Sequence, residues 1–429
     1  MPDPNAFTRR QFLYSGLAMV STVTTVPTFL SRSSLTLADT SMRLKSKSGV
    51  PEDRVLVVVQ LSGGNDGLNT IVPFGSDAYY RARPGIAVAE RDVIKLDTDQ
   101  GIGLHPNMTD LHEMIDEGIA AIVQGVGYPN PNRSHFASMD VWHCGDTRGG
   151  RGHGWIGKAL DQSRADDQSL DCICMGSQAP LAAQGKRVKP VTFEQAELFR
   201  WAGHDLHPAL GDAYDRIQHP TAGLSVGPAN DGRSDDPAAF IFRTAMDAQV
   251  ASRRIREAVA RRSETRFGRD PLSRQLETVA AMIRAELPTR VYYVAQGGFD
   301  THAAQRDTHA RLLGNFSSAV AAFYRELATT GHRGRVITLA FSEFGRRVRQ
   351  NASGGTDHGA AGPVFLFGEH LRNPGLIGTH PSLSDLNSGD LIHRTDFRSI
   401  YTDLLERWMK MDSEAALGRQ FKSAGLLRA

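Results

Sequence analysis

Continuous apolar runs alternate with helically periodic segments along most of this chain. Five runs, rich in β-branched or aromatic residues, suit strands buried on both faces. They are residues 54–61, 119–126, 290–295, 336–341 and 363–367. Elsewhere apolar residues recur every three or four positions, which predicts amphipathic helices. The predicted helices cover about residues 103–118, 237–261, 271–287, 312–327 and 396–409.

This alternation predicts an α/β fold in which a mostly parallel sheet is sandwiched by helices. The carboxyl ends of parallel strands meet at one edge of such a sheet, where ligands bind. Residues 143–235 have no comparable periodicity and many turn residues, and we interpret them as an irregular cap insertion over that edge. We expect one domain over residues 50–429, with this insertion inside it.

Polar side chains in glycine-bearing loops flank these strands, so the topology predicts that they meet at the ligand edge. They are Asn65 and Asp66, then Arg133, Ser134 and His135, then Asp300 and His302, then Glu343 and Arg346, and finally Asp357 and His358. Asp300 and His302 are two residues apart and point the same way in an extended segment. A carboxylate and an imidazole that project together are suitable metal ligands.

The sequence allows two interpretations of the role of Ser134. It precedes a predicted helix, and serine in that position usually caps the helix. Alternatively it faces a substrate, because a helix N-terminus favours an anionic group and the adjacent Arg133 adds bidentate recognition. The local sequence favours the cap and leaves both readings open.

Composition adds little to this picture. Hydrophobic residues make up 40% and charged residues 22% of the 429 positions, as in ordinary globular proteins. The net charge of +2 gives no reason to expect a nucleic-acid partner. The 15 histidines and 42 glycines are compatible with metal-site chemistry. We interpret Cys144, Cys172 and Cys174 as buried structural thiols, because the last two are too close in sequence for an easy disulfide.

The first residues predict export. Thr8-Arg9-Arg10-Gln11-Phe12-Leu13 is a twin-arginine signature, followed by a mild apolar stretch and a small-residue end near Ala38. We assign residues 1–38 to a signal peptide that is too polar for a stable membrane span. The expected partner is therefore the twin-arginine export machinery, and the expected location is periplasmic or extracellular. That machinery carries folded proteins, often with a cofactor loaded, which favours a metal.

Several segments resemble the exported bacterial family catalogued as domain of unknown function 1501, over nearly the whole mature chain. They are LSGGNDGLN (61–69), GVGYPNPNRSHFASMDVW (125–142), GGFDTH (297–302), FSEFGR (341–346) and TDHG (356–359). The order and spacing of elements is similar, more distantly, to the alkaline phosphatase-like superfamily of phosphatases, sulfatases and phosphomutases.

The resemblance implies two divalent metal ions (zinc, calcium, magnesium or manganese) and a serine nucleophile. One metal would be held by Asp66 and Glu343, the second by Asp300, His302 and His358, and the nucleophile would be Ser134. We further expect Arg133 to hold the anion, His135 to hold it or to act as general acid, and Asn65 and Arg346 to contact the substrate.

The chain also departs from the superfamily pattern. Phe344 stands where a histidine ligand is expected, which puts one of the two metal sites in doubt. The spacing of Asp300 and His302 is short, so His309 is an alternative ligand. The absence of a CxPxR sequence around Ser134 argues against a formylglycine sulfatase.

A second alternative concerns the end of the site. Asp357-His358 can itself be taken as the second ligand pair, which leaves the final histidine to His380 or His393. In the preferred assignment Asp357 only supports the ligands.

These observations lead to one preferred function and one alternative. The preferred function is an exported metal-dependent hydrolase of phosphate or sulfate esters, small or polymeric, that uses Ser134 or a metal-bound water. The alternative is a degenerate superfamily member that acts as a non-catalytic binding or assembly protein.

Overall fold

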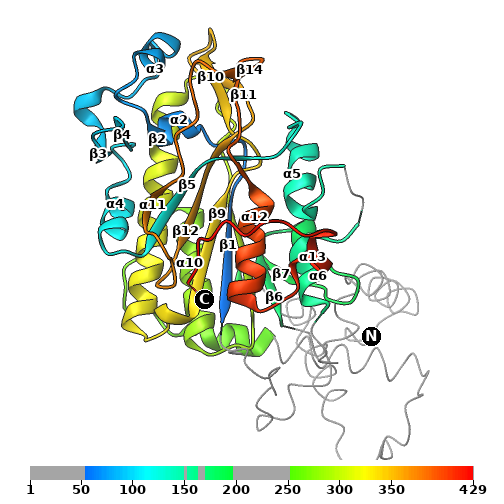
Figure 1. Cartoon of the computed structure of the whole chain (residues 1–429). Coiled ribbons are helices and arrows are strands. Elements are labelled where there is room, and N and C mark those ends of the chain that lie inside the picture. The colour runs from blue at the N-terminus through cyan, green and yellow to red at the C-terminus, as the bar shows by residue number, and fades with distance from the viewer. Residues whose placement is uncertain (1–53, 149–151, 163–169, 197–251, 429) are drawn as a thin grey trace, which may run out of the picture.

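A nine-stranded sheet forms the centre of the computed structural model, which describes residues 54–148, 152–162, 170–196 and 252–428 (Figure 1). In spatial order its strands are β13 (Gly375–Ile377), β5 (Ala120–Gly127), β12 (Gly362–Phe367), β9 (Val336–Phe341), β1 (Val55–Leu61), β8 (Val291–Gln296), β6 (Cys172–Met175) and β7 (Val191–Phe193), with β16 (Thr395–Asp396) beside β5.

The sheet is mostly parallel, as predicted. β12 is antiparallel to both β5 and β9, whereas the other neighbouring strands pair in parallel. β5 therefore has the same direction as β9 and β1. Because β12 is reversed, the residues before it lie at the edge where the parallel strands end. This reversal brings the segment around His358 to the same edge as the loops after β1, β5, β8 and β9.

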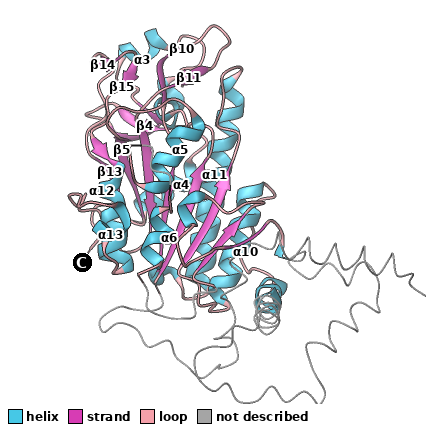
Figure 2. Ribbon diagram, turned by 90° about the vertical axis from the view of Figure 1, so that its right-hand side faces the viewer, coloured by secondary structure: helices cyan, strands magenta, loops and turns pink. Residues whose placement is uncertain are grey.

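Helices cover both faces of the sheet (Figures 1 and 2). One face carries α4 (Thr109–Asp116), α10 (Pro271–Arg284) and α11 (Gln305–Thr329), and the other carries α5 (His135–Cys144), α6 (Trp155–Leu160), α12 (Phe397–Thr402) and α13 (Ser413–Leu417). Val57 and Val59 of β1 join the first core, whereas Leu56 and Val58 join the second. This alternation explains why β1 is apolar throughout.

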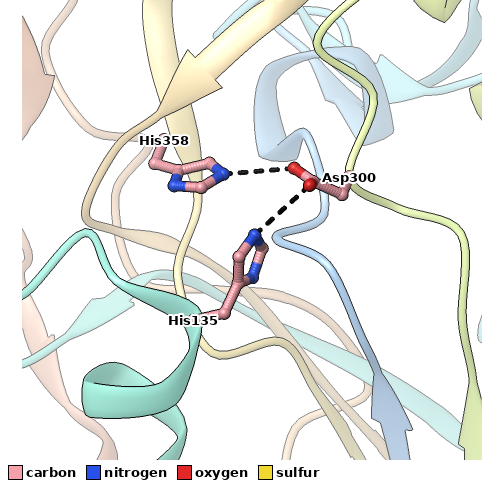
Figure 3. Close-up of side chains that lie close together, drawn as sticks. All are labelled: His135, Asp300 and His358. Carbon is pink, nitrogen blue, oxygen red and sulfur yellow. Dashed lines mark hydrogen bonds and ion pairs between the residues drawn. The ribbon is translucent and has the colours of Figure 1, made fainter.

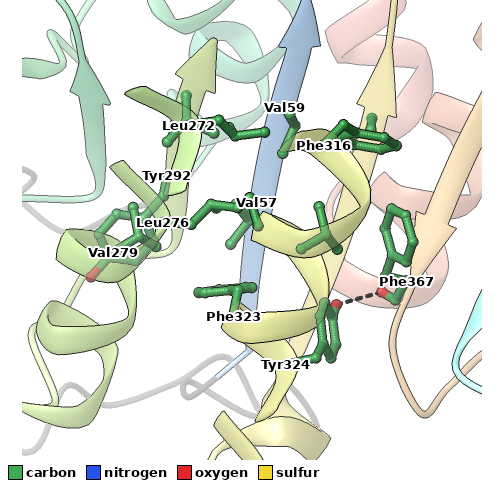
Figure 4. Close-up of a cluster of buried hydrophobic side chains, with 14 of the residues drawn as sticks. Val57, Val59, Leu272, Leu276, Val279, Tyr292, Phe316, Phe323, Tyr324 and Phe367 are labelled. Carbon is green, nitrogen blue, oxygen red and sulfur yellow. Dashed lines mark hydrogen bonds between the residues drawn. The ribbon is translucent and has the colours of Figure 1, made fainter. Parts of the chain in front are cut away.

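The first core is the larger packing layer around α11 (Figure 4). Phe316 and Phe323 of α11 are fully buried against the sheet. Tyr324 adds a hydrogen bond from its hydroxyl to the carbonyl of Phe367 at 2.7 Å, which satisfies a buried polar group. α10 begins with Asp270 as its cap, accepting from the backbone N–H of Ser273, and with Pro271 in the first turn.

Small elements lie beyond one end of the sheet (Figures 1 and 2). They are α2 (Gly67–Thr70), α3 (Asp77–Ala82), the three-stranded sheet of β2 (Ile71–Val72), β4 (Ile102–Leu104) and β3 (Ile94–Asp97), and the pairs β10 (Arg346–Gln350) with β11 (Thr356–His358) and β14 (Leu386–Asn387) with β15 (Asp390–Leu391). The remaining helical turns are Glu90–Asp92, Leu181–Ala183, Arg333–Arg335 and Asp403–Met409. The β10–β11 hairpin places His358 beside the strand ends.

The five strands predicted from the apolar runs are confirmed, each to within one residue at either end. The stretch interpreted as a cap differs: residues 172–175 and 191–193 form β6 and β7, which extend the sheet beside β8. Strands of four and three residues are too short to show a period. The same stretch also contains the end of α5 and helix α6, whereas its residues 149–151, 163–169 and 197–235 lie outside the described residues. The predicted signal peptide and residues 237–251 of a predicted helix lie outside them too, and residues 252–260 are helical. In the described part of the chain, no helix combines the length and apolarity needed to cross a membrane.

Candidate metal centre

Three side chains from distant segments converge at the carboxyl edge of the sheet. His135 is the first residue of α5, Asp300 follows β8, and His358 ends β11 (Figure 3). Their nitrogen and oxygen ligand atoms all lie within 4.8 Å of one another. His302 adjoins the group, with its Nε2 at 3.1 Å from Asp300 Oδ1 and 2.9 Å from His358 Nε2.

A glycine allows this close approach. Gly63, in the loop after β1, has a φ of +118°, and a Cβ there would lie 2.4 Å from the backbone nitrogen of Asp300. A larger residue would therefore be both strained and in collision with the Asp300 loop. The glycine-rich sequence after β1 is required for packing against the loop that carries Asp300.

Each imidazole has an acceptor behind it. His135 Nδ1 lies 2.8 Å from Glu343 Oε1, His358 Nδ1 lies 2.7 Å from the carbonyl of Arg133, and His302 Nδ1 lies 3.4 Å from Asp357 Oδ1. Carbonyl and carboxylate oxygens only accept, so the hydrogen bonds of His135 and His358 place a proton on Nδ1 of each ring. The lone pair of a neutral ring is then on Nε2, the atom that faces Asp300.

The Nε2 atoms surround the Asp300 carboxylate. Those of His358 and His135 lie 3.1 Å from Oδ1 and 3.4 Å from Oδ2, respectively. His135 Nε2 is buried and has no hydrogen-bond partner among the described residues. At zinc–nitrogen distances of about 2.0–2.1 Å, neighbouring ligands of a tetrahedral site lie about 3.3 Å apart. The residues present therefore fit a divalent metal, and imidazole ligands favour zinc or a similar transition metal over magnesium or calcium.

Arg346 holds the Asp300 carboxylate in place. Its guanidinium is fully buried, and Nη2 lies 2.8 Å from Asp300 Oδ1. Its other contacts are to the backbone carbonyls of Gly63, Gly64, Phe299 and Thr356. Burial alone would raise the pKa of Asp300, but the hydrogen bond and charge of Arg346, with the His358 contact, lower it to about 2. Arg346, predicted to contact the substrate, has its donors directed at the protein.

Glu343 stands behind His135. Its side chain is 1% exposed, and Oε1 accepts from His135 Nδ1 at 2.8 Å and from the N–H of Gly63 at 2.9 Å. Oε2 accepts from the hydroxyl of Ser342 at 3.1 Å. Glu343, predicted as a metal ligand, thus contacts the site through the histidine in front of it.

Asp66, predicted as a ligand of the other metal, is a buried ion-pair partner. Arg83 Nη1 lies 2.5 Å from Asp66 Oδ2, and both side chains are 0% exposed. Gln305 donates to the same oxygen, and Oδ1 caps α2 through the N–H of Leu68 at 3.2 Å. Burial raises the pKa of Asp66, and the charge and hydrogen bond of Arg83, together with His309 and Gln305, outweigh this, so that the pKa is lowered. Nothing in the sequence around Arg83 signals this partner.

Ser134 is exposed at the N-cap position of α5, where its side chain makes no capping hydrogen bond. Its N–H donates to Asn132 Oδ1 at 2.8 Å. Arg133, beside it, donates through Nε and Nη2 to Asp390 Oδ2 at 2.9 and 2.6 Å. The guanidinium expected to hold the substrate anion is therefore paired with a carboxylate, whereas the hydroxyl of Ser134 is exposed next to His135.

Phe344 packs against the cluster. Its ring centroid lies 4.9 Å from that of His135 and 4.6 Å from that of His358. The residue that stands in place of a histidine ligand therefore packs against two of the imidazoles.

Asn65 is 1% exposed, with Oδ1 accepting from Thr70 Oγ1 at 3.0 Å and Nδ2 without a partner among the described residues.

The alternative histidines have other contacts. His309 Nε2 lies 2.9 Å from Asn65 Oδ1 in the interior, where burial lowers its pKa to about 4. His380 Nδ1 lies 2.9 Å from the carbonyl of Pro381. Burial lowers the pKa of His393. Among the described residues, none of the three belongs to the His135–Asp300–His358 group.

Residues 232–425 match the family model described as "Protein of unknown function (DUF1501)", which confirms the expected resemblance for that part of the chain. The matched residues include Asp300, Glu343 and His358, whereas the motifs around Asp66 and His135 precede them. No curated protein matches the chain in sequence.

Solved structures with a similar arrangement have low sequence identity. A phosphonate monoester hydrolase from Silicibacter pomeroyi has 9% identity and a TM-score of 0.32, covering 86% of this chain and 76% of its own. The PsFucS1 sulfatase from Pseudoalteromonas sp. has 7% identity and a TM-score of 0.36, covering 87% and 73%. A TAB5 alkaline phosphatase mutant with bound Mg has 10% identity and a TM-score of 0.35, covering 85% and 99%. Likenesses with TM-scores this low do not define a function.

Proposed function

We propose that this chain is an exported metal-dependent hydrolase of phosphate or sulfate esters. The observation that carries the proposal is the set of three imidazoles around Asp300, each with Nδ1 toward an acceptor and Nε2 toward the carboxylate. The Nε2 atoms of His302 and His358 lie 2.9 Å apart, close to the separation of neighbouring ligands in a tetrahedral site. A cation bound to both would also meet the Asp300 carboxylate, whose Oδ1 lies 3.1 Å from each nitrogen.

In this proposal one metal ion is held by His135, Asp300, His302 and His358. A divalent metal at this site supplies Lewis-acid stabilisation of charge on a phosphoryl or sulfuryl oxygen. The ligands for a second metal are engaged elsewhere, because Asp66 is paired with Arg83 and Glu343 contacts His135. The proposal therefore has one metal where the resemblance implied two.

Ser134 is the proposed nucleophile. Its hydroxyl is exposed, makes no cap, and precedes the ligand His135. The first N–H groups of the ten-residue helix α5 have no partner within the helix, and with the helix dipole they favour an anionic group beside Ser134. Ser134 attacks phosphorus or sulfur as the alcohol leaves, and water then hydrolyses the ester formed on Ser134. Phosphate and sulfate share this requirement, so both are proposed substrates.

A non-catalytic binding protein is the second candidate. The pairing of Arg133 with Asp390 and of Arg346 with Asp300 favours it, because neither guanidinium is directed at a substrate. This candidate retains the metal site and predicts no ester turnover.

The test measures metal and turnover together on natively exported protein. We expect bound transition metal by mass spectrometry and hydrolysis of an aryl phosphate or aryl sulfate. His358→Ala should lose both, whereas Ser134→Ala should lose turnover and keep the metal. His112→Ala, on the surface of α4 near Asp116, is the matched control. Wild-type protein without bound metal would refute the proposal. If the protein binds metal but shows no turnover that depends on Ser134, the binding protein is the better candidate.

Export has its own test. The proposal rests on the Arg9-Arg10 pair, which the twin-arginine machinery reads. Replacing both with lysine should retain the protein in the cytoplasm, as measured by cell fractionation. Unchanged export would contradict this route.

A further inference from the structure

We propose that Glu343 is a positioning residue that holds His135 with its proton on Nδ1 and its Nε2 directed at Asp300. The inference rests on the proposed metal site and deepens it. It differs from the assignment of Glu343 as a ligand, because it gives this carboxylate no contact with the metal.

The contacts of Glu343 are those of a fixed acceptor. Oε1 lies 2.8 Å from His135 Nδ1 and 2.9 Å from the N–H of Gly63, and Oε2 lies 3.1 Å from Ser342 Oγ. These three donors come from α5, the loop after β1 and the end of β9. The carboxylate therefore cannot rotate away from His135 without losing buried hydrogen bonds.

Charge supports the same role. Glu343 is 1% exposed, and in the described part of the chain its ion-pair partner is His135. A buried carboxylate without a positive partner is costly, since burial disfavours the charged form. A metal on Nε2 would make the imidazole the positive partner that Glu343 otherwise lacks. In turn the carboxylate would raise the basicity of the ring and so strengthen its bond to the metal.

The segment that carries Glu343 also sets the ring plane of His135. The backbone carbonyl of Glu343 accepts from Ser138 Oγ at 2.5 Å, which ties the end of β9 to α5. The next residue, Phe344, packs against the His135 ring at 4.9 Å. One short segment thus fixes both the proton and the orientation of the imidazole.

Glu343 is the acceptor best suited to a mutational test. The acceptor behind His358 is the backbone carbonyl of Arg133, which no side-chain substitution removes. The acceptor behind His302 is Asp357, whose side chain is 56% exposed and 3.4 Å away. Only Glu343 is both a side chain and buried.

The first measurement is zinc affinity. Glu343→Ala removes the acceptor and should lower the affinity about 10- to 100-fold. Glu343→Gln keeps an acceptor oxygen and loses the charge, so its loss should be smaller. Glu326→Gln is the matched control, because Glu326 is equally buried and pairs with Arg284 at 2.6 Å on a different element. Its zinc affinity should equal that of the wild type.

The second measurement needs no metal. Ring ¹⁵N shifts of His135 in the metal-free protein should show the Nδ1–H form in the wild type and Glu343→Gln, and a change of form in Glu343→Ala. Circular dichroism checks folding, and Glu343→Gln still tests the charge contribution through zinc affinity if the alanine variant does not fold.

The outcomes separate the two proposals. In a folded Glu343→Ala variant, an unchanged ring form together with unchanged zinc affinity would overturn the positioning role. If that variant does not fold, wild-type zinc affinity or a changed ring form in Glu343→Gln would overturn it. If wild-type protein binds no zinc but the ring form still depends on Glu343, the positioning role stands and the metal-dependent function fails.

Discussion

Asp66 and Asp300 follow neighbouring parallel strands, and each comes after a pair of glycines, yet the structure uses them in opposite ways. Asp66 is 0% exposed and locked by Arg83, whereas Asp300 is 48% exposed and faces three imidazoles. The loops are alike in sequence pattern and position. The difference lies in which distant residues reach each carboxylate.

The charge balance of the two carboxylates explains the contrast. Arg83, just after α3, gives Asp66 a complete partner and is itself held by the carbonyl of Val348 at 2.8 Å. Arg346 donates to Asp300 through one nitrogen, and its other N–H groups donate to backbone carbonyls. Asp66 therefore stabilises the fold, and Asp300 remains available for a cation.

The largest expected effect is on stability. Asp66→Asn leaves Arg83 buried without a charged partner, which should cost about 3–5 kcal/mol of unfolding free energy. Denaturant unfolding measures this loss. Asp77→Asn, in a pair that is 92% exposed on the aspartate side, is the control and should change nothing measurable. Equal stability of Asp66→Asn and the wild type would remove the contrast between the two carboxylates.

Asp300→Asn should produce the opposite phenotype. Loss of the carboxylate should lower zinc affinity about 100-fold or more. Changing a residue that only hydrogen-bonds a metal ligand lowers affinity about 10- to 100-fold, and losing a ligand should cost at least as much. The metal-free variant should lose less unfolding free energy than Asp66→Asn, because half of the Asp300 side chain is exposed and Arg346 keeps its four backbone-carbonyl acceptors. Isothermal titration and thermal unfolding provide the two values, and wild-type zinc affinity in this variant would argue against the site.

Acid should weaken the buried network beside Asp66. Burial holds the pKa of His309 at about 4, below its ordinary value of 6.5, and the Asp66 charge offsets this only in part. Between these values the unfolded chain binds more protons, so the contribution of His309 is present above pH 6.5 and is lost as the pH falls toward 4. From pH 7 to 5 this should remove about 1–2 kcal/mol.

The check compares unfolding free energies of wild type and His309→Gln at both pH values. Glutamine does not titrate, so the variant should lose about 1–2 kcal/mol less on acidification. Identical losses in the two proteins would assign the acid sensitivity to other groups.

The smallest effect is expected at Asp357. Its side chain is 56% exposed and lies 3.4 Å from His302 Nδ1. Asp357→Asn keeps an acceptor oxygen, so zinc affinity should fall less than about tenfold, since exposed pairs contribute up to about 1 kcal/mol. A loss as large as that of Asp300→Asn would make Asp357 part of the binding group.

Much of the fold was predictable from local pattern. Five strands are apolar runs that have to be buried whatever their neighbours in the sheet are, and the sequence located each to within one residue: β1, β5, β8, β9 and β12. β6 and β7 were missed because strands of four and three residues carry no period. The position of Asp300 and His302 at this edge also followed from the parallel strands, whereas His358 reaches it because β12 is antiparallel to β5 and β9.

The sequence by itself determined the strands, the edge at which the polar loops meet, and the residue types available there. Only the tertiary structure decided their partners: Arg83 for Asp66, Glu343 for His135, and three imidazoles for Asp300. The physical reason is that the period of apolar residues in a segment reports how that segment itself is buried. The neutralisation of a charged side chain depends instead on groups tens to hundreds of residues away. For this chain that balance separates a fold-stabilising carboxylate from the one at the centre of the candidate metal site.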